Sequence, residues 1–268
     1  MKQLETRLLG HTGLNVSVIS LGSGRVLRLN FADAIRRRVR LIQESIELGI
    51  NFFDTADSYA FGWDERVLGM ATRNTGTDVF IGTKVGYPAS CLGKISRKFS
   101  GRAGQNFDRD YIHKQCDRSL RLLQRNAIDV YYLHSPPCER IPEGLEALSG
   151  LKKQGKIRYT GIAFGKISDF LSLPPHSVDV VQIPLSADPK ELASAVEKCG
   201  QDGLGCVIRQ PFYYQKEWLA NAKELDPGAP DLFLKMLAAR FPVSSFLFST
   251  QNPLNLRQNV SRFAASID

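Results

Sequence analysis

The stretch "NFFDTADSYAFGWDERVLG", from Asn51 to Gly69, begins like a buried β-strand and ends like an amphipathic helix. A strand followed directly by a helix is the repeating unit of folds that are built on parallel strands. Five ionisable side chains fall within twelve residues of this stretch: Asp54, Asp57, Tyr59, Asp64 and Glu65. The fold has to account for so many charged groups at the point where an apolar strand ends.

The alternation of strand and helix continues along the chain. Eight segments have the length and apolar character of a strand: Val16–Leu21 and residues 51–56, 79–85, 128–135, 158–164, 178–185, 205–212 and 244–250. Amphipathic segments lie between them, at residues 37–50, 64–71, 111–126, 143–157, 190–203 and 231–241. Eight such units in about 250 residues predict an α/β fold of the (β/α)8 TIM barrel type. We expect a single domain over residues 1–268.

Two short strands around "GHTG", within residues 5–22, precede the first barrel strand. This pattern predicts an N-terminal β-hairpin that caps the bottom of the barrel. The rival fold is a doubly wound Rossmann sheet, which carries Gly-x-Gly-x-x-Gly after its first strand. Here "GSGRVL" has Gly22 and Gly24 but Leu27 in the third position, so we discount this fold.

Composition limits the classes of function. The chain has no apolar run of the roughly 18 residues that a membrane span needs, and no signal-peptide core, so we expect a cytoplasmic protein without a membrane partner. Its five cysteines are odd in number and form no CxxC pair, which argues against a metal site. The net charge is +8, but no nucleic-acid-binding motif accompanies the basic clusters, so nucleic acid is the weaker interpretation.

Polar side chains stand where three successive apolar strands end. Asp54 closes the second strand with Tyr59 just beyond it, Lys84 closes the third, and His134 closes the fourth. Active sites of (β/α)8 barrels lie at this end of the strands. A buried ammonium needs an anionic partner, which Asp54 would give Lys84, and a cation beside a tyrosine favours the phenolate. The set predicts a tuned general acid, suited to a carbonyl that accepts a hydride and then needs a proton.

These residues resemble the motifs of the aldo-keto reductase superfamily over nearly the whole chain. "GINFFDTADSYAFGWDERVLG" is similar to the family's Gly-x-x-x-x-Asp-Thr-Ala-x-x-Tyr-Gly segment, and "IGTKVG" and "DVYYLHSPP" follow at the expected intervals. The resemblance implies that Asp54, Tyr59, Lys84 and His134 form a catalytic tetrad with Tyr59 as proton donor. It also implies NADP(H) or NAD(H) extended across the barrel mouth, and a small-molecule carbonyl substrate.

The resemblance also implies a set of cofactor-binding residues. Besides Asp54, Gly24 and Arg25 would lie beside the nicotinamide ribose, and Gln182 would hold the carboxamide. Arg209 stands where members of the family carry an aromatic residue or an arginine, with Gln210 and Phe212 near the pyrophosphate. The segment "FLFSTQNPLNLRQNV" resembles the adenosine-binding segment and contributes Ser249, Thr250, Gln251, Gln258 and Asn259.

The sequence departs from the family pattern in several places. Ala163 and Phe164 replace the usual Ser-Asn that holds the carboxamide, and Ala60 replaces a glycine. Ser249 and Asn255 stand where NADPH-preferring members carry Lys and Arg, which leaves the choice between NADPH and NADH open, although Arg257 is close in sequence. The basic loop 86–108 is either a mobile lid over the site or a surface loop.

Three functions therefore compete. The leading hypothesis is an NAD(P)H-dependent reductase of aldehydes or ketones. The second is a barrel of the same family adapted to a lyase, dehydratase or isomerase step, which the lost carboxamide contacts would favour. The third is a nucleotide-sensing subunit without catalysis, against which the four retained residues argue. The identity of the substrate and the oligomeric state do not follow from the sequence.

Overall fold

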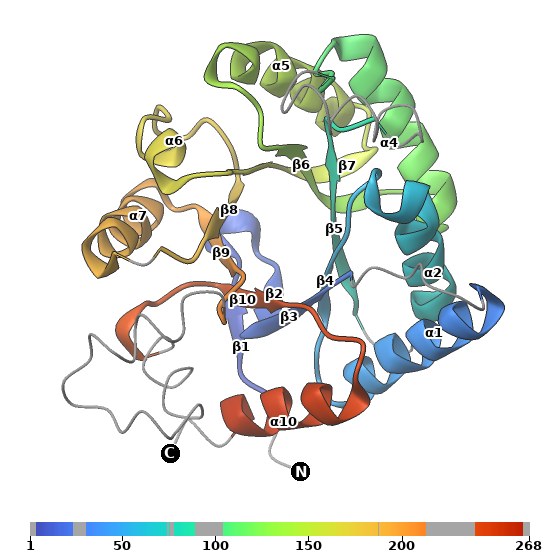
Figure 1. Ribbon diagram of the computed structural model, residues 1–268. Coiled ribbons are helices and arrows are strands. Elements are labelled where there is room, and N and C mark those ends of the chain that lie inside the picture. Colours follow the sequence, from blue (N-terminus) through green and yellow to red (C-terminus); the bar gives the residue numbers. More distant parts are fainter. Residues whose placement is uncertain are drawn as a thin grey trace.

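Eight parallel strands form a closed barrel in the computed structural model, which describes residues 4–23, 31–73, 75, 78–88, 104–186, 188–212 and 239–264. Neighbours follow the order β10-β3-β4-β5-β6-β7-β8-β9 around the barrel (Figure 1). The strands are β3 (Ile19–Gly22), β4 (Phe52–Asp54), β5 (Phe80–Val85), β6 (Ile128–His134), β7 (Ile157–Ala163), β8 (Val180–Pro184), β9 (Gly205–Arg209) and β10 (Ser245–Phe248). The predicted (β/α)8 barrel is confirmed.

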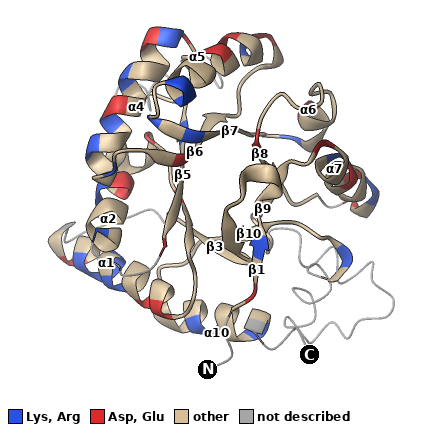
Figure 2. Cartoon of the chain, turned by 180° about the vertical axis from the view of Figure 1, so that it is seen from behind, with Lys and Arg blue, Asp and Glu red and all other residues tan. Residues whose placement is uncertain are grey.

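Helices surround the barrel on the outside (Figure 1). They are α1 (Phe31–Glu47), α2 (Trp63–Thr72), α4 (Arg109–Leu123), α5 (Ile141–Lys153), α6 (Ile167–Leu171), α7 (Pro189–Asp202) and α10 (Pro253–Ala264). In Figure 2 their ribbons carry most of the charged residues, while the strands are largely uncharged. This distribution is expected where helices cover the outer face of the strands and side chains fill the barrel interior. The helix predicted at residues 231–241 falls mostly outside the described residues.

The predicted N-terminal hairpin is also confirmed. Strand β1 (Thr6–Leu8) pairs antiparallel with β2 (Asn15–Ser17), and a short 3-10 helix η1 (Gly10–Thr12) joins them. Leu9 and Leu14 are buried together with side chains from inside the barrel, among them Phe52 and Val180 near the starts of their strands. The hairpin therefore closes the N-terminal end of the barrel, and the opposite end remains for the site.

The barrel interior has room for one large aromatic ring on β6 because the strands on either side of it, β5 and β7, each carry a glycine. A Cβ atom on Gly82 of β5 would lie 2.8 Å from the Tyr132 ring, and one on Gly161 of β7 would lie 2.4 Å from it. The Tyr132 side chain of β6 is fully buried there. Both glycines are thus required by the packing of Tyr132.

Two boundaries differ from the sequence-based expectation. The segment Val16–Leu21 is shared between β2 and β3, with Val18 bent between them, so the barrel strand starts at Ile19. Helix α6 has only five residues, which is too short for a helical period to show in the sequence.

Within the described ranges, no helix combines the length and the apolar character that a membrane crossing requires.

Candidate active site

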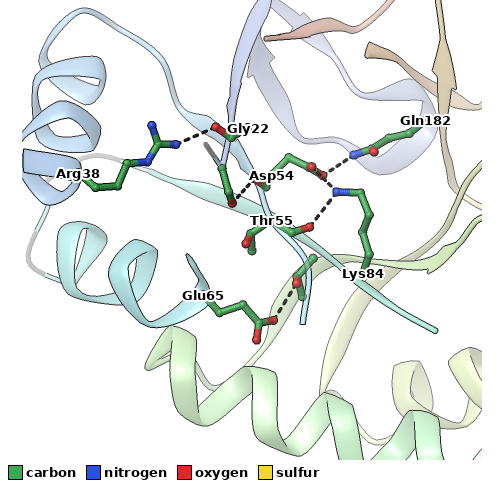
Figure 3. A network of polar contacts seen from close by, with 9 residues as sticks. Gly22, Arg38, Asp54, Thr55, Glu65, Lys84 and Gln182 are labelled. Carbon is green, nitrogen blue, oxygen red and sulfur yellow. Dashed lines mark hydrogen bonds and ion pairs between the residues drawn. The ribbon is translucent and has the colours of Figure 1, made fainter. Parts of the chain in front are cut away.

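A buried network of side chains from three strands lies at the C-terminal end of the barrel (Figure 3). The Asp54 carboxylate accepts hydrogen bonds from Lys84 Nζ through one oxygen and from Gln182 Nε2 through the other. Lys84 Nζ also donates to the Thr55 carbonyl at 2.8 Å. Asp54 and Lys84 are only 4% and 3% exposed. A buried ammonium is stable only with such partners, so the pair fixes the position of both charges.

Tyr59 lies above this ion pair, in the 3-10 helix η2 (Tyr59–Gly62) that follows β4. Lys84 Nζ is 5.4 Å from the centroid of the Tyr59 ring. The His134 ring, at the end of β6, meets the Tyr59 ring edge-on at 5.9 Å between centroids. Tyr59 and His134 are partly exposed, whereas Asp54 and Lys84 are buried. The structure thus brings the four predicted residues together, with two groups open to a ligand and two charges beneath them.

Tyr87 completes the aromatic side of the site. Its ring packs edge-on against His134 with 4.8 Å between centroids, and its carbonyl accepts a hydrogen bond from the Tyr111 hydroxyl at 3.4 Å. Gln105 donates from its side-chain amide to the carbonyls of His134 at 2.9 Å and Ser135 at 3.1 Å. The end of β6 is therefore held from two sides. Of the basic loop 86–108, which the sequence leaves as either a lid or a surface loop, residues 89–103 lie outside the described residues.

The backbone around Tyr59 is strained. Ala60 and Phe61 have positive φ values of 47° and 59°, and Gly62 follows with 88°. A left-handed conformation costs a residue with a Cβ atom about 1–2 kcal/mol. Glycine is the residue that adopts this conformation freely, which is why the family places one directly after the tyrosine. Ala60 keeps the conformation in this chain without that advantage.

A second buried polar group lies on the outer side of β5. Glu65, in the first turn of α2, accepts a hydrogen bond from the Thr83 hydroxyl at 2.8 Å (Figure 3). Burial raises the pKa of the Asp57 carboxyl well above its ordinary value, the Glu65 carboxylate adds to this rise, and Arg118 opposes it. Burial likewise raises the pKa of Glu65, and Ser119, Thr83 and Arg118 oppose this rise. Asp57 and Glu65 are thus buried acids separate from the Asp54–Lys84 pair.

Arg38 ties the first barrel strand to the segment after the last one. From the buried face of α1 it donates to the Gly22 carbonyl at 2.7 Å (Figure 3). It also donates to the Thr250 carbonyl at 2.8 Å. Burial lowers the pKa of the guanidinium to about 10, and the Asp64 carboxylate opposes this change. Arg38 therefore links the end of β3 to the chain just after β10, which belongs to the predicted adenosine-binding segment.

The predicted cofactor residues are spread around the barrel mouth. Ser249 and Gln251 are exposed after β10 and Thr250 is half-buried, while α10 carries exposed Gln258 and buried Asn259. At the end of β9, Arg209 and Phe212 are half-buried, and Gln210 is exposed with φ at +58°. Gly24 and Arg25 lie outside the described residues.

Gln182 is the residue that the family pattern assigns to the nicotinamide carboxamide. It is fully buried, and its amide donates to Asp54. Ala163 and Phe164, at the end of β7, are also buried. The Phe164 carbonyl accepts a hydrogen bond from Arg209 Nη2 at 2.5 Å. The apolar end of β7 therefore binds Arg209 through its backbone. Burial lowers the pKa of Arg209, and Tyr59, Asp54 and Tyr87 oppose this change.

Sequence reasoning missed three residues that shape the site. Tyr132 lies beneath it, where burial raises the pKa of the phenol, Asp54 adds to the rise, and Gln182 opposes it. Arg38 and Arg118 reach the site from helices in which arginine reads as a surface residue. For Tyr132, a glycine in each of the two flanking strands is a usable signal. Of the two arginines, Arg38 has a signal in the sequence: it lies three and four residues before apolar Leu41 and Ile42, on the same face of α1.

The fold and the site define a (β/α)8 barrel protein with ionisable residues at the C-terminal ends of its strands. The model of the Aldo/keto reductase family matches residues 19–229. An uncharacterized oxidoreductase, YqkF of Bacillus subtilis, is 29% identical over 297 residues, covering 96% of this chain and 90% of the relative. The aldo-keto reductase yakc [NADP(+)] of Schizosaccharomyces pombe is 33% identical over 217 residues, covering 77% of this chain and 60% of the relative.

A solved structure agrees with these sequence matches. The holo form of an aldo-keto reductase from Bacillus halodurans has a TM-score of 0.78 and 25% identity, covering 97% of this chain and 91% of the other. The chain belongs to the aldo/keto reductase family, and it is an oxidoreductase.

Proposed function

We propose that this protein is a nicotinamide-dependent reductase of aldehydes or ketones in which Tyr59 donates the proton. The observation that carries the proposal is the buried Asp54–Lys84 pair, which lies under the partly exposed Tyr59 ring with His134 at its edge. A proton donor that faces a ligand, with a fixed cation beneath it, suits a reaction that creates negative charge on an oxygen.

The proposed chemistry balances with one hydride and one proton. When bound, the reduced nicotinamide supplies the hydride to the carbonyl carbon. The Tyr59 hydroxyl gives its proton to the carbonyl oxygen, and the Lys84 ammonium stabilises the phenolate that remains. His134 is placed to hydrogen-bond the same oxygen. Asp54 keeps the ammonium in place, and Gln182 keeps Asp54 oriented.

The donors at the mouth fit a dinucleotide better at its phosphate end than at its nicotinamide end. Arg209 is a cation at the mouth, and Ser249, Thr250 and Gln251 offer hydroxyl and amide groups after β10. A carboxamide would find only backbone groups at Ala163 and Phe164. Arg257 is the nearest basic residue in the sequence for binding a 2′-phosphate, and it forms an ion pair with Glu44. The name of the fission-yeast relative favours NADP, so both nucleotides belong in the test.

The first test is a fluorescence titration of the purified protein with NADPH and with NADH. It is followed by absorbance at the nicotinamide band with a panel of aldehydes and ketones. Binding together with turnover of a carbonyl compound supports the proposal, and the tighter nucleotide is the cofactor. Failure to bind either nucleotide overturns it and leaves the lyase or isomerase alternative, while binding without turnover of any carbonyl favours a nucleotide-sensing role.

Replacing Tyr59 tests the proton donor directly. Tyr59→Phe should lower kcat by about 10²–10⁴-fold, the usual contribution of a general acid, with the dissociation constant of the nucleotide unchanged. Tyr159→Phe is the matched control, because the Tyr159 hydroxyl donates to the Thr12 carbonyl of η1, in the hairpin that closes the other end of the barrel. Turnover by Tyr59→Phe at the wild-type rate would rule out this role for Tyr59.

A further inference from the structure

The first half of the loop that carries Tyr59 forms backbone hydrogen bonds with strand β5. The amide of Thr55 donates to the Gly82 carbonyl at 2.9 Å, and the amide of Asp57 donates to the Lys84 carbonyl at 3.1 Å. Both bonds continue the pairing of β4 with β5. After Tyr59 the backbone turns through the left-handed residues 60–62 before α2 begins at Trp63. This second half has no strand to hold it.

Arg118 of α4 reaches this second half from outside the barrel. Its Nη2 donates to the Phe61 carbonyl at 2.7 Å, and its Nη1 makes a longer contact with the Asp57 carbonyl at 3.4 Å. These carbonyls lie two residues before and two residues after Tyr59. A single guanidinium therefore bridges the two ends of the segment that positions the proposed proton donor.

Gly62 provides the space for this contact. A Cβ atom at position 62 would lie 2.5 Å from Arg118 Nη2 and 2.8 Å from the Leu122 side chain, so a larger residue would push the guanidinium away. The φ of 88° also favours glycine there. The same glycine thus permits both the left-handed turn and the approach of Arg118.

We propose that Arg118 is a positioning residue that holds the Tyr59 ring in its place beside Lys84, an inference that rests on the proposed reductase function. Left-handed non-glycine residues persist only where surrounding contacts impose them. The planar guanidinium of Arg118 makes such a contact because it binds two backbone carbonyls at once. Both hydrogen bonds are present without a ligand. Without the fork, Ala60 and Phe61 relax toward ordinary backbone angles and Tyr59 moves from its place. Arg118 itself touches no reacting atom.

A charge effect is the competing explanation. Arg118 also lowers the pKa values of Asp57 and Glu65, so its removal changes the electrostatics of the buried acids. Arg118→Lys separates the two roles, because lysine keeps the charge but cannot present two parallel N–H groups to two carbonyls. If charge alone matters, the lysine variant behaves like the wild type. If the fork matters, it behaves like Arg118→Met.

The experiment compares Arg118→Met and Arg118→Lys with the control Arg121→Met. Arg121 is exposed on the same helix, and its Nε donates to a carbonyl within that helix. Hydrogen exchange of the backbone amides of residues 55–62 reports on the loop and needs no activity. On the same samples, kcat and KM for the best carbonyl substrate and the dissociation constant of the nucleotide are measured, along with the isotope effect from a deuterated nicotinamide.

The proposal predicts faster exchange in residues 55–62 for both Arg118 variants, with β6 and α4 unchanged. It predicts that kcat falls by about 10- to 100-fold, as expected for a misplaced catalytic group, with the nucleotide dissociation constant unchanged and a larger isotope effect. Unchanged loop exchange, unchanged kcat, full rescue by lysine, or an equal loss in Arg121→Met each overturns it. If Arg118→Met does not fold, Arg118→Lys decides alone. If the wild type reduces no carbonyl, the proposed function has failed, and the positioning role falls with it, whatever the exchange data show.

Discussion

Each oxygen of the Asp54 carboxylate has a different partner, one from the neighbouring strand and one from the strand across the barrel. Lys84 of β5 is a charge partner, whereas Gln182 of β8 is neutral and fully buried. The family pattern assigns this glutamine to the nicotinamide carboxamide. In the structure its amide is already committed to Asp54. The amide nitrogen serves Asp54, and the amide oxygen has no hydrogen-bond partner among the described residues, so substitution of Gln182 tests which role matters.

Gln182→Met should slow the reaction without weakening nucleotide binding, because its main contact is with Asp54. Leaving one buried carboxylate oxygen without a donor costs about 1–3 kcal/mol. If that cost falls on the transition state, it corresponds to about a 5- to 150-fold loss of kcat. Steady-state kinetics and a nucleotide titration on one preparation check both quantities. A large rise in the nucleotide dissociation constant at normal kcat would show that the amide serves the carboxamide instead.

The strained residue next to Tyr59 offers a stability test. Ala60→Gly should raise the free energy of unfolding by about 0.5–1 kcal/mol, because glycine adopts the φ of 47° without a Cβ penalty. Urea denaturation measures the change. Ala193→Gly, at an exposed position inside α7, is the opposite control, and it should lower stability by about 0.5–1 kcal/mol. Equal losses in both variants would mean that Ala60 is not strained.

At the scale of the elements, the strands were predictable because each is a nearly continuous apolar run that ends in a polar residue. All eight lie where the runs lie, and the two departures have local causes. The bend at Val18 divides one run between hairpin and barrel, and α6 is too short for a period to show. The parallel order of the strands then places Asp54, Lys84 and His134 at one end. The strand pattern was therefore sufficient for the fold and for the placement of the strand-end residues.

The contacts of the site could not be predicted in the same way. Arg118 and the loop that it holds are 57 and 61 residues apart, and Arg38 and Thr250 are 212 apart. In α1, Arg38 lies in line with apolar residues, but nothing local identifies the carbonyls that it reaches, and nothing local in α4 distinguishes Arg118 from an arginine that reaches water. The partner of Gln182 was equally hidden, because a strand pattern gives the face of a side chain but not the acceptor that it chooses.

Helix α1 carries one of these long-range contacts, and its removal should be costly. Arg38→Met leaves the carbonyls of Gly22 and Thr250 without a donor, so we expect the free energy of unfolding to fall by about 1–3 kcal/mol. Arg37→Met removes a neighbouring exposed arginine and should change stability by less than about 0.5 kcal/mol. Urea denaturation of the two variants checks this difference. Equal effects would mean that the two carbonyls find other donors.

At the scale of the whole molecule, stability is the sum of contributions that vary with pH in different directions. Asp57 is the clearest source of such variation, because it is fully buried and its pKa is raised well above the ordinary value of 3.8. Glu65 adds to the rise, while Arg118 and Lys84 oppose it. The folded state therefore keeps a proton on Asp57 over a pH range in which the unfolded chain has lost it. Protonation in that range favours folding.

The stabilising effect of this proton is complete below the unfolded pKa and is lost as the pH rises through the folded pKa. Asp57→Asn removes the titration while keeping the shape, so the variant should gain stability relative to the wild type as the pH rises from about 4 to about 8. Urea denaturation across this range gives the difference at each pH. Asp78→Asn, at an exposed acid with no burial to relieve, should show no such trend. A constant difference between Asp57→Asn and the wild type would mean that Asp57 is ionised in the folded protein throughout, with Arg118 as its counter-charge.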